Sequence, residues 1–328
     1  MTLLVQQENL ALGVDVGGTH LRVALVTPQG SIVRSVRQQL VERSPEEILD
    51  QLERGVEALK PPPGALPLGI GLAAQIWTST GTVAVAPNLG WRNVPFGAML
   101  RARFGPHVRM VNDLNAIAVG EARYGSGAGT ADLVCIFVGT GVGMGAVCAG
   151  HVLEGANGLA TELGHIKVAS PLTGRLCGCG ERGCLEAYTS GRYLPELFAE
   201  KIQAGLQSPL WDAHGGDLKG IDAEALDRAY SQGDAAAIAL WEDVSTHLAR
   251  AVGDVVTLFN PRVVVWGGGV LAWAPALKAR VVELLPLYAA RPAMAQVQLK
   301  ATTLGDESGV LGAACLAWEA YAAAVSPR

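Results

Sequence analysis

Two glycine-rich turns, about 120 residues apart, constrain the possible folds of this 328-residue chain more than any other feature. The first, Gly17-Gly18-Thr19, interrupts the aliphatic segment 10–26, and the second, Gly139-Thr140-Gly141, interrupts the aliphatic segment 133–147. Aliphatic strands on both sides of a glycine turn predict a β-hairpin whose tip is bare backbone. Two such hairpins in one chain predict two lobes, each presenting backbone N–H groups to a polyphosphate in the cleft between them.

The length of the chain supports two lobes, because a single hydrophobic core stops growing at about 250–300 residues. Short apolar strands alternate with amphipathic helices, which predicts an α/β fold. The expected strands include 68–73, 108–111 and 263–266, and the expected helices include 44–59, 114–124 and 235–258. We expect residues 1–113 and 311–328 to form a smaller N-terminal lobe, and residues 114–310 to form a larger C-terminal lobe.

The composition and charge argue against several classes of function. The chain is 50% hydrophobic, has a net charge of −5 and shows no basic recognition helix, so we expect no nucleic-acid partner. The first ten residues lack the positively charged and apolar regions of a signal peptide, which indicates a cytoplasmic protein. The longest uncharged run, 133–150, contains five glycines and lacks interfacial anchors, so we interpret it as a buried strand pair and expect no membrane partner.

Two aspartates follow expected strands. Asp15 precedes the first glycine turn, where a carboxylate can approach a magnesium ion or its waters, although an aspartate there can also cap the hairpin. Asn112-Asp113 follows the strand 108–111 and precedes a helix, which is where open α/β sheets bind ligands. Asp113 can accept the proton of an attacking hydroxyl in phosphoryl transfer, or it can cap the helix. The residues alone leave both pairs of alternatives open.

Three cysteines in one short segment predict a metal site. The spacing of Cys177, Cys179 and Cys184 is more typical of metal ligation than of a disulfide framework, and three thiolates with one imidazole complete a tetrahedral Zn²⁺ site. The histidines that could supply the fourth ligand are His165, His151 and His214. Four protein ligands leave no position for water, so the zinc would be structural and would fix the loop that carries Glu162 and Glu186.

Together these segments resemble the ROK family (repressor, open reading frame, kinase), whose members are sugar kinases and related transcription factors. The resemblance runs nearly from end to end of the chain. The residues that match the phosphate and adenosine motifs are Asp15, Gly17, Gly18, Thr19, Gly139, Thr140, Gly141, Gly143, Gly145, Gly267, Gly268 and Gly269. The residues that match the sugar, catalytic and zinc motifs are Asn88, Asn112, Asp113, Asn115, Glu162, Gly164, His165, Cys177, Cys179, Gly180, Gly183, Cys184 and Glu186. The resemblance implies a two-lobed, actin-like (ribonuclease H-like) α/β fold with an interlobe cleft and a structural zinc loop.

The resemblance also implies roles for the matching residues. Asp113 would be the base that accepts the proton of the sugar 6-hydroxyl. The residues implied to bind the other sugar hydroxyls are Asn88, Asn112, Glu162, His165 and Glu186. The implied zinc ligands are His165, Cys177, Cys179 and Cys184. The phosphate and adenosine motifs would bind ATP, which carries Mg²⁺, and the protein would form a homodimer or homotetramer.

Two departures from the family pattern concern the sugar. Thr161 stands where the family usually has a glycine before the ExGH motif, and the segment 73–76 lacks a glycine-proline pair that many members have beside the sugar. The segment 71–91 resembles the family's bacterial glucokinases, so we expect D-glucose as the substrate and glucose 6-phosphate as the product. N-acetylmannosamine or N-acetylglucosamine is the alternative substrate, and polyphosphate is the alternative donor.

A regulator that senses a sugar without catalysis is the alternative from another class. Repressors of the family place a helix-turn-helix before the sugar-binding part, and only 14 residues precede Asp15, so we expect no such domain. A non-catalytic sensor would lose the base or a phosphate turn, whereas Asp113 and both glycine turns are present. We therefore expect an enzyme.

Overall fold

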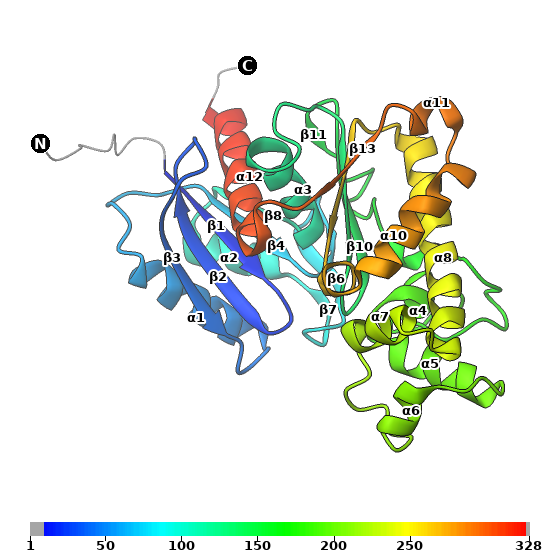
Figure 1. Ribbon diagram of the computed structural model, residues 1–328. Helices are drawn as coiled ribbons and strands as arrows, with labels where there is room; N and C mark the ends of the chain where they lie inside the picture. Colours follow the sequence, from blue (N-terminus) through cyan, green and yellow to red (C-terminus); the bar gives the residue numbers. More distant parts are fainter. Residues whose placement is uncertain (1–9, 326–328) are drawn as a thin grey trace, which may run out of the picture. The chain divides into compact units, whose positions relative to one another are not determined.

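The computed structural model describes residues 10–325, and its contacts divide the chain into two compact units (Figure 1). Unit 1 comprises the residues up to 135, residues 145–161 and the residues from 302 onward. Unit 2 comprises residues 136–144 and 162–301. Residues 1–9, on which the expectation of no signal peptide rests, lie outside the described residues.

A five-stranded mixed sheet forms the centre of unit 1, with the strand order β3-β2-β1-β4-β8. Its strands are β1 (Ala11–Val16), β2 (His20–Val26), β3 (Ile32–Gln39), β4 (Leu68–Leu72) and β8 (Val108–Asn112). The first three strands are antiparallel neighbours, whereas β4 and β8 run parallel to β1. The expected strands in 10–26, 68–73 and 108–111 are confirmed, and the parallel register brings the carboxyl ends of β1, β4 and β8 to one edge of the sheet.

Two helices, α3 (Asp113–Tyr124) and α12 (Ser308–Val325), pack against this sheet and against each other (Figure 1). Their backbones approach so closely that a Cβ atom at Gly312 of α12 would collide with the backbone carbonyl of Ala116 in α3. A Cβ atom at Gly69 of β4 would likewise collide with the carbonyl of Ala313. Because these glycines have no side chain, α12 can pack closely against both α3 and β4.

The remaining elements of unit 1 include α1 (Pro45–Ala58), which packs against β2 and β3. The helix begins where the sequence predicts, because the Ser44 hydroxyl accepts a hydrogen bond from the Glu47 backbone N–H at 3.3 Å. The others are the small antiparallel sheet of β5 (Gln75–Trp77), β6 (Thr82–Ala86) and β7 (Trp91–Val94), the helix α2 (Phe96–Phe104) and the 3₁₀ turn η3 (Gly305–Glu307).

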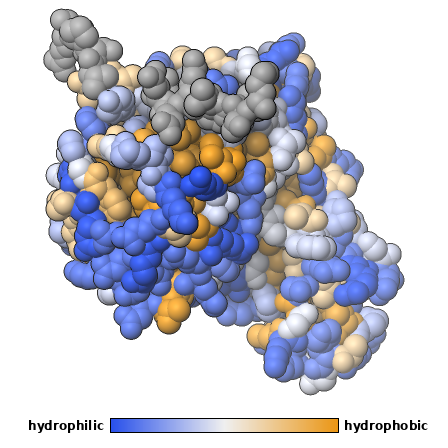
Figure 2. Space-filling view, turned by 90° about the vertical axis from the view of Figure 1, so that its left-hand side faces the viewer, coloured by the Kyte–Doolittle hydropathy of each residue, from blue (hydrophilic) through white to orange (hydrophobic). Residues whose placement is uncertain are grey.

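Figure 2 shows a face of the molecule on which hydrophilic residues predominate beside a smaller hydrophobic area.

A second five-stranded sheet has the strand order β11-β10-β9-β12-β13. Its strands are β9 (Leu133–Val138), β10 (Val142–Cys148), β11 (His151–Val152), β12 (Val263–Gly267) and β13 (Gln298–Ala301). The uncharged run 133–150 therefore forms two strands of this sheet, as the sequence predicts. No helix among residues 10–325 is long and apolar enough to cross a membrane.

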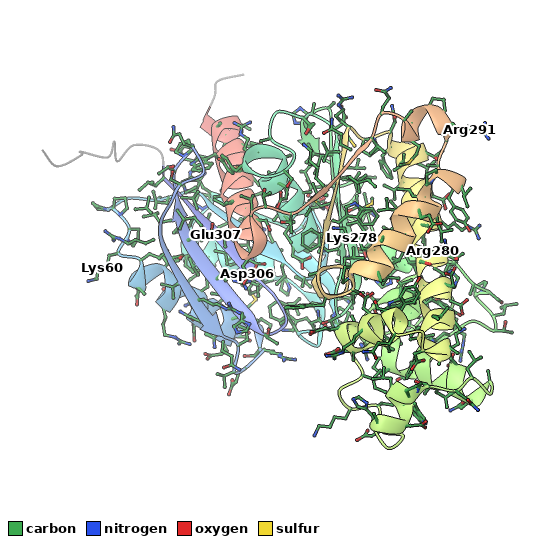
Figure 3. The ribbon with its side chains drawn as sticks, viewed as in Figure 1. Lys60, Lys278, Arg280, Arg291, Asp306 and Glu307 are labelled. Carbon is green, nitrogen blue, oxygen red and sulfur yellow. The ribbon has the colours of Figure 1, made fainter. Side chains whose placement is uncertain are left out.

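Unit 2 is rich in helices, and its longest helix is α8 (Ala235–Phe259), which confirms the helix expected over 235–258. Trp241 of this helix is fully buried, and Asp234 caps it by accepting hydrogen bonds from two backbone N–H groups. Arg280 of α10 (Pro275–Leu284), which is labelled in Figure 3, forms an ion pair with Glu242 of α8 at 2.9 Å. The other helices and 3₁₀ turns are η1 (Leu163–His165), α4 (Glu186–Thr189), α5 (Leu194–Gln203), α6 (Pro209–Ala213), α7 (Ala223–Ser231), α9 (Gly269–Trp273), α10 (Pro275–Leu284), η2 (Leu285–Leu287) and α11 (Arg291–Met294).

The division by contacts differs from the expected lobe boundary at residue 113. The helix α3 belongs to unit 1, because it packs against α12, β4 and β8, whereas the sequence suggested a larger lobe that begins with this helix. Residues 302–310 also belong to unit 1. The expected functional lobes, residues 1–113 with 311–328 and residues 114–310, therefore remain a prediction.

Unit 1 also contains a buried carboxylate that the sequence does not single out. Glu121 of α3 is fully buried, and its side chain accepts hydrogen bonds from the backbone N–H of Ser126 (2.8 Å), the backbone N–H of Leu304 (3.3 Å) and the hydroxyl of Thr302. Two backbone N–H groups and one hydroxyl thus satisfy the hydrogen-bonding capacity of the buried carboxylate, and none of these three donors is a cation. Glu121 thus ties the end of α3 to the segment that leads into α12.

Candidate active site

The first glycine turn lies at the tip of the β1–β2 hairpin in unit 1. The backbone N–H of Gly17 donates to the carbonyl of His20 at 3.0 Å and closes the turn. Asn88, in the connection between β6 and β7, lies against this tip, because a Cβ atom at Gly18 would be 3.3 Å from the Cβ of Asn88. The structure therefore brings the predicted first phosphate turn and the predicted sugar-side asparagine together.

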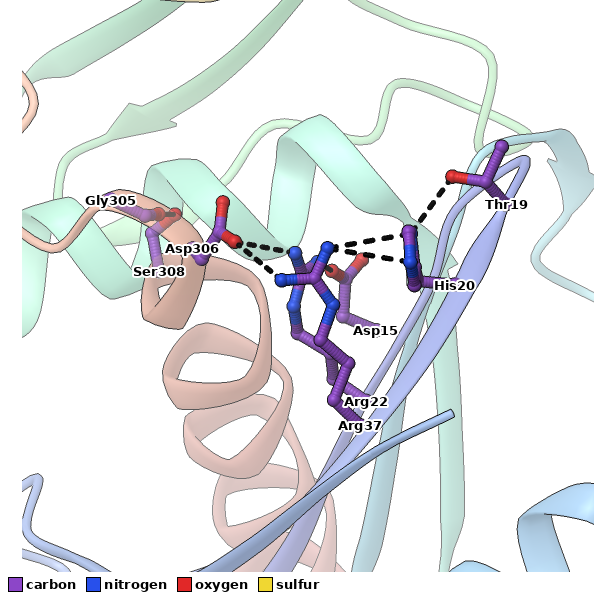
Figure 4. Close-up of polar contacts among 8 residues, drawn as sticks. All are labelled: Asp15, Thr19, His20, Arg22, Arg37, Gly305, Asp306 and Ser308. Atoms are coloured by element: carbon purple, nitrogen blue, oxygen red, sulfur yellow. Dashed lines mark hydrogen bonds and ion pairs between the residues drawn. The ribbon is translucent and has the colours of Figure 1, made fainter. Parts of the chain in front are cut away.

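Asp15, two residues before that turn, lies in a network of alternating charges (Figure 4). Arg22, its partner in the strand register, donates to Asp15 at 3.0 Å and to Asp306 at 2.6 Å, and Arg37 lies 3.5 Å from Asp306. Burial raises the pKa of Asp15 above its ordinary value, and the neighbouring Arg22 opposes part of that rise. The sequence did not identify Arg22 as a partner of Asp15, although the pairing follows once the hairpin register is known.

The two residues of the predicted catalytic pair stand at the junction of β8 and α3. Asn112 is the N-cap of α3: its side-chain oxygen accepts from the backbone N–H of Leu114 at 2.9 Å, and its amide donates to the carbonyl of Ala74 at 3.2 Å. Asp113 is the first residue of the helix, is half-buried, and also accepts from the Leu114 N–H at 2.9 Å. The cap position is thus held by Asn112, and Asp113 adds a carboxylate beside it.

The second glycine turn joins β9 to β10, and both of its ends are held within unit 2. The N–H of Gly139 donates to the carbonyl of Gly141 at 2.9 Å, and the N–H of Gly191 donates to the carbonyl of Gly139 at 2.8 Å. Thr140 is exposed in this turn, and Gly143 lies in β10. The third glycine run packs against the same turn, because a Cβ atom at Gly139 would lie 3.6 Å from the backbone nitrogen of Gly269.

Gly267 ends β12, and Gly268, with a φ of 91°, directs the chain into α9, which Gly269 begins. A Cβ atom at Gly268 would collide with the backbone of Val138 at the end of β9. Glycine is therefore required at this position both by the sign of φ and by the neighbouring strand. The two predicted nucleotide segments of unit 2 therefore pack against each other.

The predicted metal ligands converge in unit 2. One ligand atom from each of His165, Cys177, Cys179 and Cys184 lies within 4.8 Å of all the others. The Cys179 and Cys184 sulfurs are 3.8 Å apart, and the Cys177 sulfur is 3.9 Å from the His165 Nδ1. A tetrahedral zinc ion with bonds of about 2.1–2.3 Å requires ligand separations of roughly 3.5–3.8 Å. The Cys179–Cys184 and Cys177–His165 separations match this requirement, and no other separation in the cluster exceeds 4.8 Å.

The structure also resolves which histidine accompanies the cysteines. His151 lies in β11 of unit 1, and the Nδ1 of His214 is 2.9 Å from the carbonyl of Leu210, whereas His165 joins the cluster. Burial raises the pKa of Cys177 to about 12 and also raises that of Cys184. Both thiols therefore favour their protonated form unless a cation replaces the protons.

Two carboxylates flank the cluster. The Nε2 of His165, on the far side of the ring from the cysteines, is 3.8 Å from Glu162. One oxygen of Glu186 lies 3.7 Å from the Cys177 sulfur, and the other accepts from the backbone N–H of Val142 at 3.0 Å, directly after the second glycine turn. Glu186 thus connects the cysteine cluster to the second turn, a link that no sequence motif revealed.

The predicted site residues therefore fall into two sets. Unit 1 carries Asp15, Gly17, Gly18, Thr19, Asn88, Asn112 and Asp113. Unit 2 carries Gly139, Thr140, Gly141, Gly143, Glu162, His165, Cys177, Cys179, Cys184, Glu186, Gly267, Gly268 and Gly269. Each set contains a glycine turn with an exposed threonine and at least one carboxylate, groups suited to holding phosphates and to accepting a proton.

Residues 11–320 match the sequence pattern of the ROK family. The protein belongs to the ROK family. A ROK glucokinase from Streptomyces griseus, whose structure is a complex with glucose and AMPPNP, is 31% identical and superimposes with a TM-score of 0.74 over 95% of this chain and 100% of that one. The fold is thus the α/β fold of ROK sugar kinases, with mixed sheets.

Two curated relatives carry different names. The glucokinase of Thermotoga maritima is 34% identical over 307 residues, which is 93% of this chain and 96% of the relative. The N-acetylmannosamine kinase of Escherichia fergusonii is 32% identical over 316 residues, which is 93% of this chain and 97% of the relative. Both similarities cover 93% of this chain, so they support a sugar kinase and leave the sugar open.

Proposed function

We propose that this ROK protein is a phosphotransferase that transfers the γ-phosphoryl group of ATP to the 6-hydroxyl of a hexose, and that the hexose is D-glucose. The observation that carries the proposal is the pair of glycine turns at hairpin tips, one in each unit, in a chain 31% identical to a glucokinase that binds glucose and AMPPNP. The segment 71–91 and the similarity to the Thermotoga maritima glucokinase favour glucose among the hexoses.

In the proposed reaction Asp113 is the general base. The sugar O6 attacks the γ-phosphorus, the bond from that phosphorus to the β–γ bridging oxygen breaks, and ADP leaves. The O6 proton passes to the carboxylate of Asp113, and the rest of the catalysis is positioning and electrostatic stabilisation of the phosphates. The half-buried position of Asp113 at the start of α3, with Asn112 in the cap position, suits this role.

The other proposed roles follow the two sets of residues. The sugar hydroxyls that do not react are bound by Asn88, Asn112, Glu162, His165 and Glu186. The N–H groups of Gly17 and Gly139 close their own turns. The remaining backbone N–H groups of both turns hold the phosphates, and Gly267, Gly268 and Gly269 border the adenosine. Asp15 approaches the Mg²⁺ that ATP carries, and this ion neutralises charge on the phosphates. The proposal requires both sets to act on one sugar and one nucleotide, so the interlobe cleft is part of it.

We further propose that the cysteine cluster holds a structural Zn²⁺. His165, Cys177, Cys179 and Cys184 would hold the ion, and four protein ligands would leave no position for water. The protein's own contribution is the orientation of His165: its Nδ1 faces the cysteines, so its Nε2 remains for Glu162 and the sugar. A cytoplasmic homodimer or homotetramer remains our expectation for the assembly.

A coupled assay of ADP release over a panel of sugars tests the proposal. With ATP and Mg²⁺, we expect saturable ADP release with glucose and the highest kcat/KM for glucose among glucose, mannose, fructose, N-acetylglucosamine and N-acetylmannosamine. The product with glucose should be a substrate for glucose-6-phosphate dehydrogenase, which distinguishes the 6-position from the others. Polyphosphate in place of ATP, with the same readout of the product, tests the alternative donor.

N-acetylmannosamine kinase is the second candidate, because a relative of that name is 32% identical over nearly the whole chain. A kcat/KM for N-acetylmannosamine at least ten times that for glucose would replace glucose in the proposal. Sugar binding without ADP release, for every sugar of the panel, would instead indicate a sugar-sensing regulator and contradict the proposed enzyme.

A further inference from the structure

Thr161, which directly precedes Glu162, has an unusual backbone conformation. Its φ is 69°, in the left-handed region. The other non-glycine residues with positive φ in the described part of the chain are Lys60, Asn93, Ala149 and Asn260. Thr161 is the β-branched member of this group, and β-branched residues adopt the region rarely because the side chain crowds the backbone. Strain of this kind persists only where the surrounding structure imposes it, and it concentrates at functional sites.

The segment that leads to Thr161 is held firmly within unit 1. Glu154, near the start of the segment, forms an ion pair with Arg109 of β8. In the middle, the carbonyl of Asn157 accepts from the backbone N–H of Thr78 at 3.2 Å. These two anchors leave little freedom for the chain between them and Thr161, so they can sustain the left-handed conformation.

The third anchor is the side chain of Thr161 itself. Its hydroxyl donates to the carbonyl of Ala160 at 2.5 Å and lies 3.4 Å from the side-chain oxygen of Asn115. Asn115 is buried in α3, two residues after Asp113. The hydroxyl therefore holds the adjoining peptide of residue 160, and the Thr161 side chain lies beside the helix that carries the proposed base.

We propose that Thr161 is a positioning residue that sets the direction in which the chain presents Glu162 to the sugar. This inference rests on the proposed function, in which Glu162 binds a hydroxyl of the sugar. A glycine in place of Thr161 could adopt the same φ without strain, but it would also visit many other conformations. Threonine anchored by its hydroxyl restricts the backbone to one of them, so Glu162 is oriented before the sugar arrives and loses less entropy on binding.

The experiment compares Thr161→Gly, Thr161→Ser and Asn260→Gly with the wild type. For Thr161→Gly we expect an unchanged or higher Tm, because the strain is removed, and a rise of about fivefold in the KM for the sugar, because Glu162 is no longer preorganised. The kcat and the KM for ATP should stay at their wild-type values. Thr161→Ser keeps the hydroxyl and should restore the sugar KM to within about twofold of the wild type. Asn260→Gly relieves a positive φ of 45° at the end of α8, and is the control for relief of strain elsewhere.

An unchanged sugar KM in Thr161→Gly would overturn the inference, and so would an equal rise in the KM values for sugar and ATP, which would indicate general loosening. The proposed function fails separately, if the wild type releases no ADP with any sugar. In that case the Kd for glucose, measured by calorimetry on the same variants, decides the inference: a Kd that rises about fivefold in Thr161→Gly supports it, and an unchanged Kd, or no glucose binding by the wild type, overturns it.

Discussion

At the start of α3, the side chains of Asn112 and Asp113 approach one backbone amide, the N–H of Leu114, at 2.9 Å each. Asn112 has the extended backbone of a cap residue, with a ψ of 145°, whereas Asp113 is already helical. The sequence could not decide between them, because asparagine and aspartate are equally favoured as N-caps. The structure assigns the N-cap position to Asn112, whereas Asp113 lies one residue inside the helix and accepts from the same amide.

The cysteine cluster is a second place where the sequence alone could not assign a role to a single residue. The three cysteines could be predicted from their spacing, because the ligand types define the site. The fourth ligand could not be predicted from spacing, because it depends on how the chain folds back. An antiparallel bridge between Lys167 and Cys184 brings the end of the cysteine segment beside the turn of His165, and no sequence pattern encodes that bridge.

Replacement of one cysteine tests the metal site. We expect the purified wild type to contain about one zinc per chain by elemental analysis, and Cys179→Ser to contain little, because three remaining ligands hold the ion poorly. The variant should have a lower Tm and a higher KM for the sugar, since His165 and Glu162 lose their support. Cys148→Ser, a partly buried cysteine outside the cluster, is the matched control. Full zinc content in Cys179→Ser, or a zinc-free active wild type, would refute the site.

At the scale of elements, hydrophobic periodicity predicted the long and apolar parts well. The strands β1, β2, β4, β8 and β12 and the helices α1, α3 and α8 all follow from it. The small sheet β5-β6-β7 was not predicted, because its strands have only three to five residues and no clear alternation. That sheet carries the connection with Asn88, so a part of the sugar side depends on elements too short for the sequence to reveal.

The contact of α12 with α3 gives a prediction with an unusual sign. Replacing a glycine by alanine inside a helix normally stabilises it by about 1 kcal/mol. Gly312→Ala should instead lower the free energy of unfolding by about 2–3 kcal/mol, because the new Cβ collides with the backbone carbonyl of Ala116. Urea unfolding followed by circular dichroism measures the difference.

The control is in the same helix. Ala320→Gly changes an exposed residue of α12 and should cost only the helix propensity, about 1 kcal/mol. A Gly312→Ala variant more stable than the wild type would show that the two helices do not pack as described.

For the whole molecule, the family and the order of its motifs could be inferred from sequence, but the division into units could not. Hydrophobic patterns show that α3 is amphipathic without showing which elements cover it, and its contacts with α12 link residues about 190 apart in the chain. The burial of Glu121, whose carboxylate accepts hydrogen bonds from Ser126, Thr302 and Leu304, likewise could not be predicted from the sequence. A glutamate in a helix is usually exposed, so its burial can be seen only in the folded protein.

The glucose-dependent rate of ADP release by Asp113→Asn, compared with the wild type, tests the central claim most directly. Asparagine keeps the shape of the side chain and Asn112 keeps the cap, so the variant should fold and bind glucose with a Kd close to the wild-type value. Because the base is lost, kcat should fall by at least about 100-fold. A kcat within about threefold of the wild type, with normal glucose binding, would contradict the assignment of Asp113 as the catalytic base.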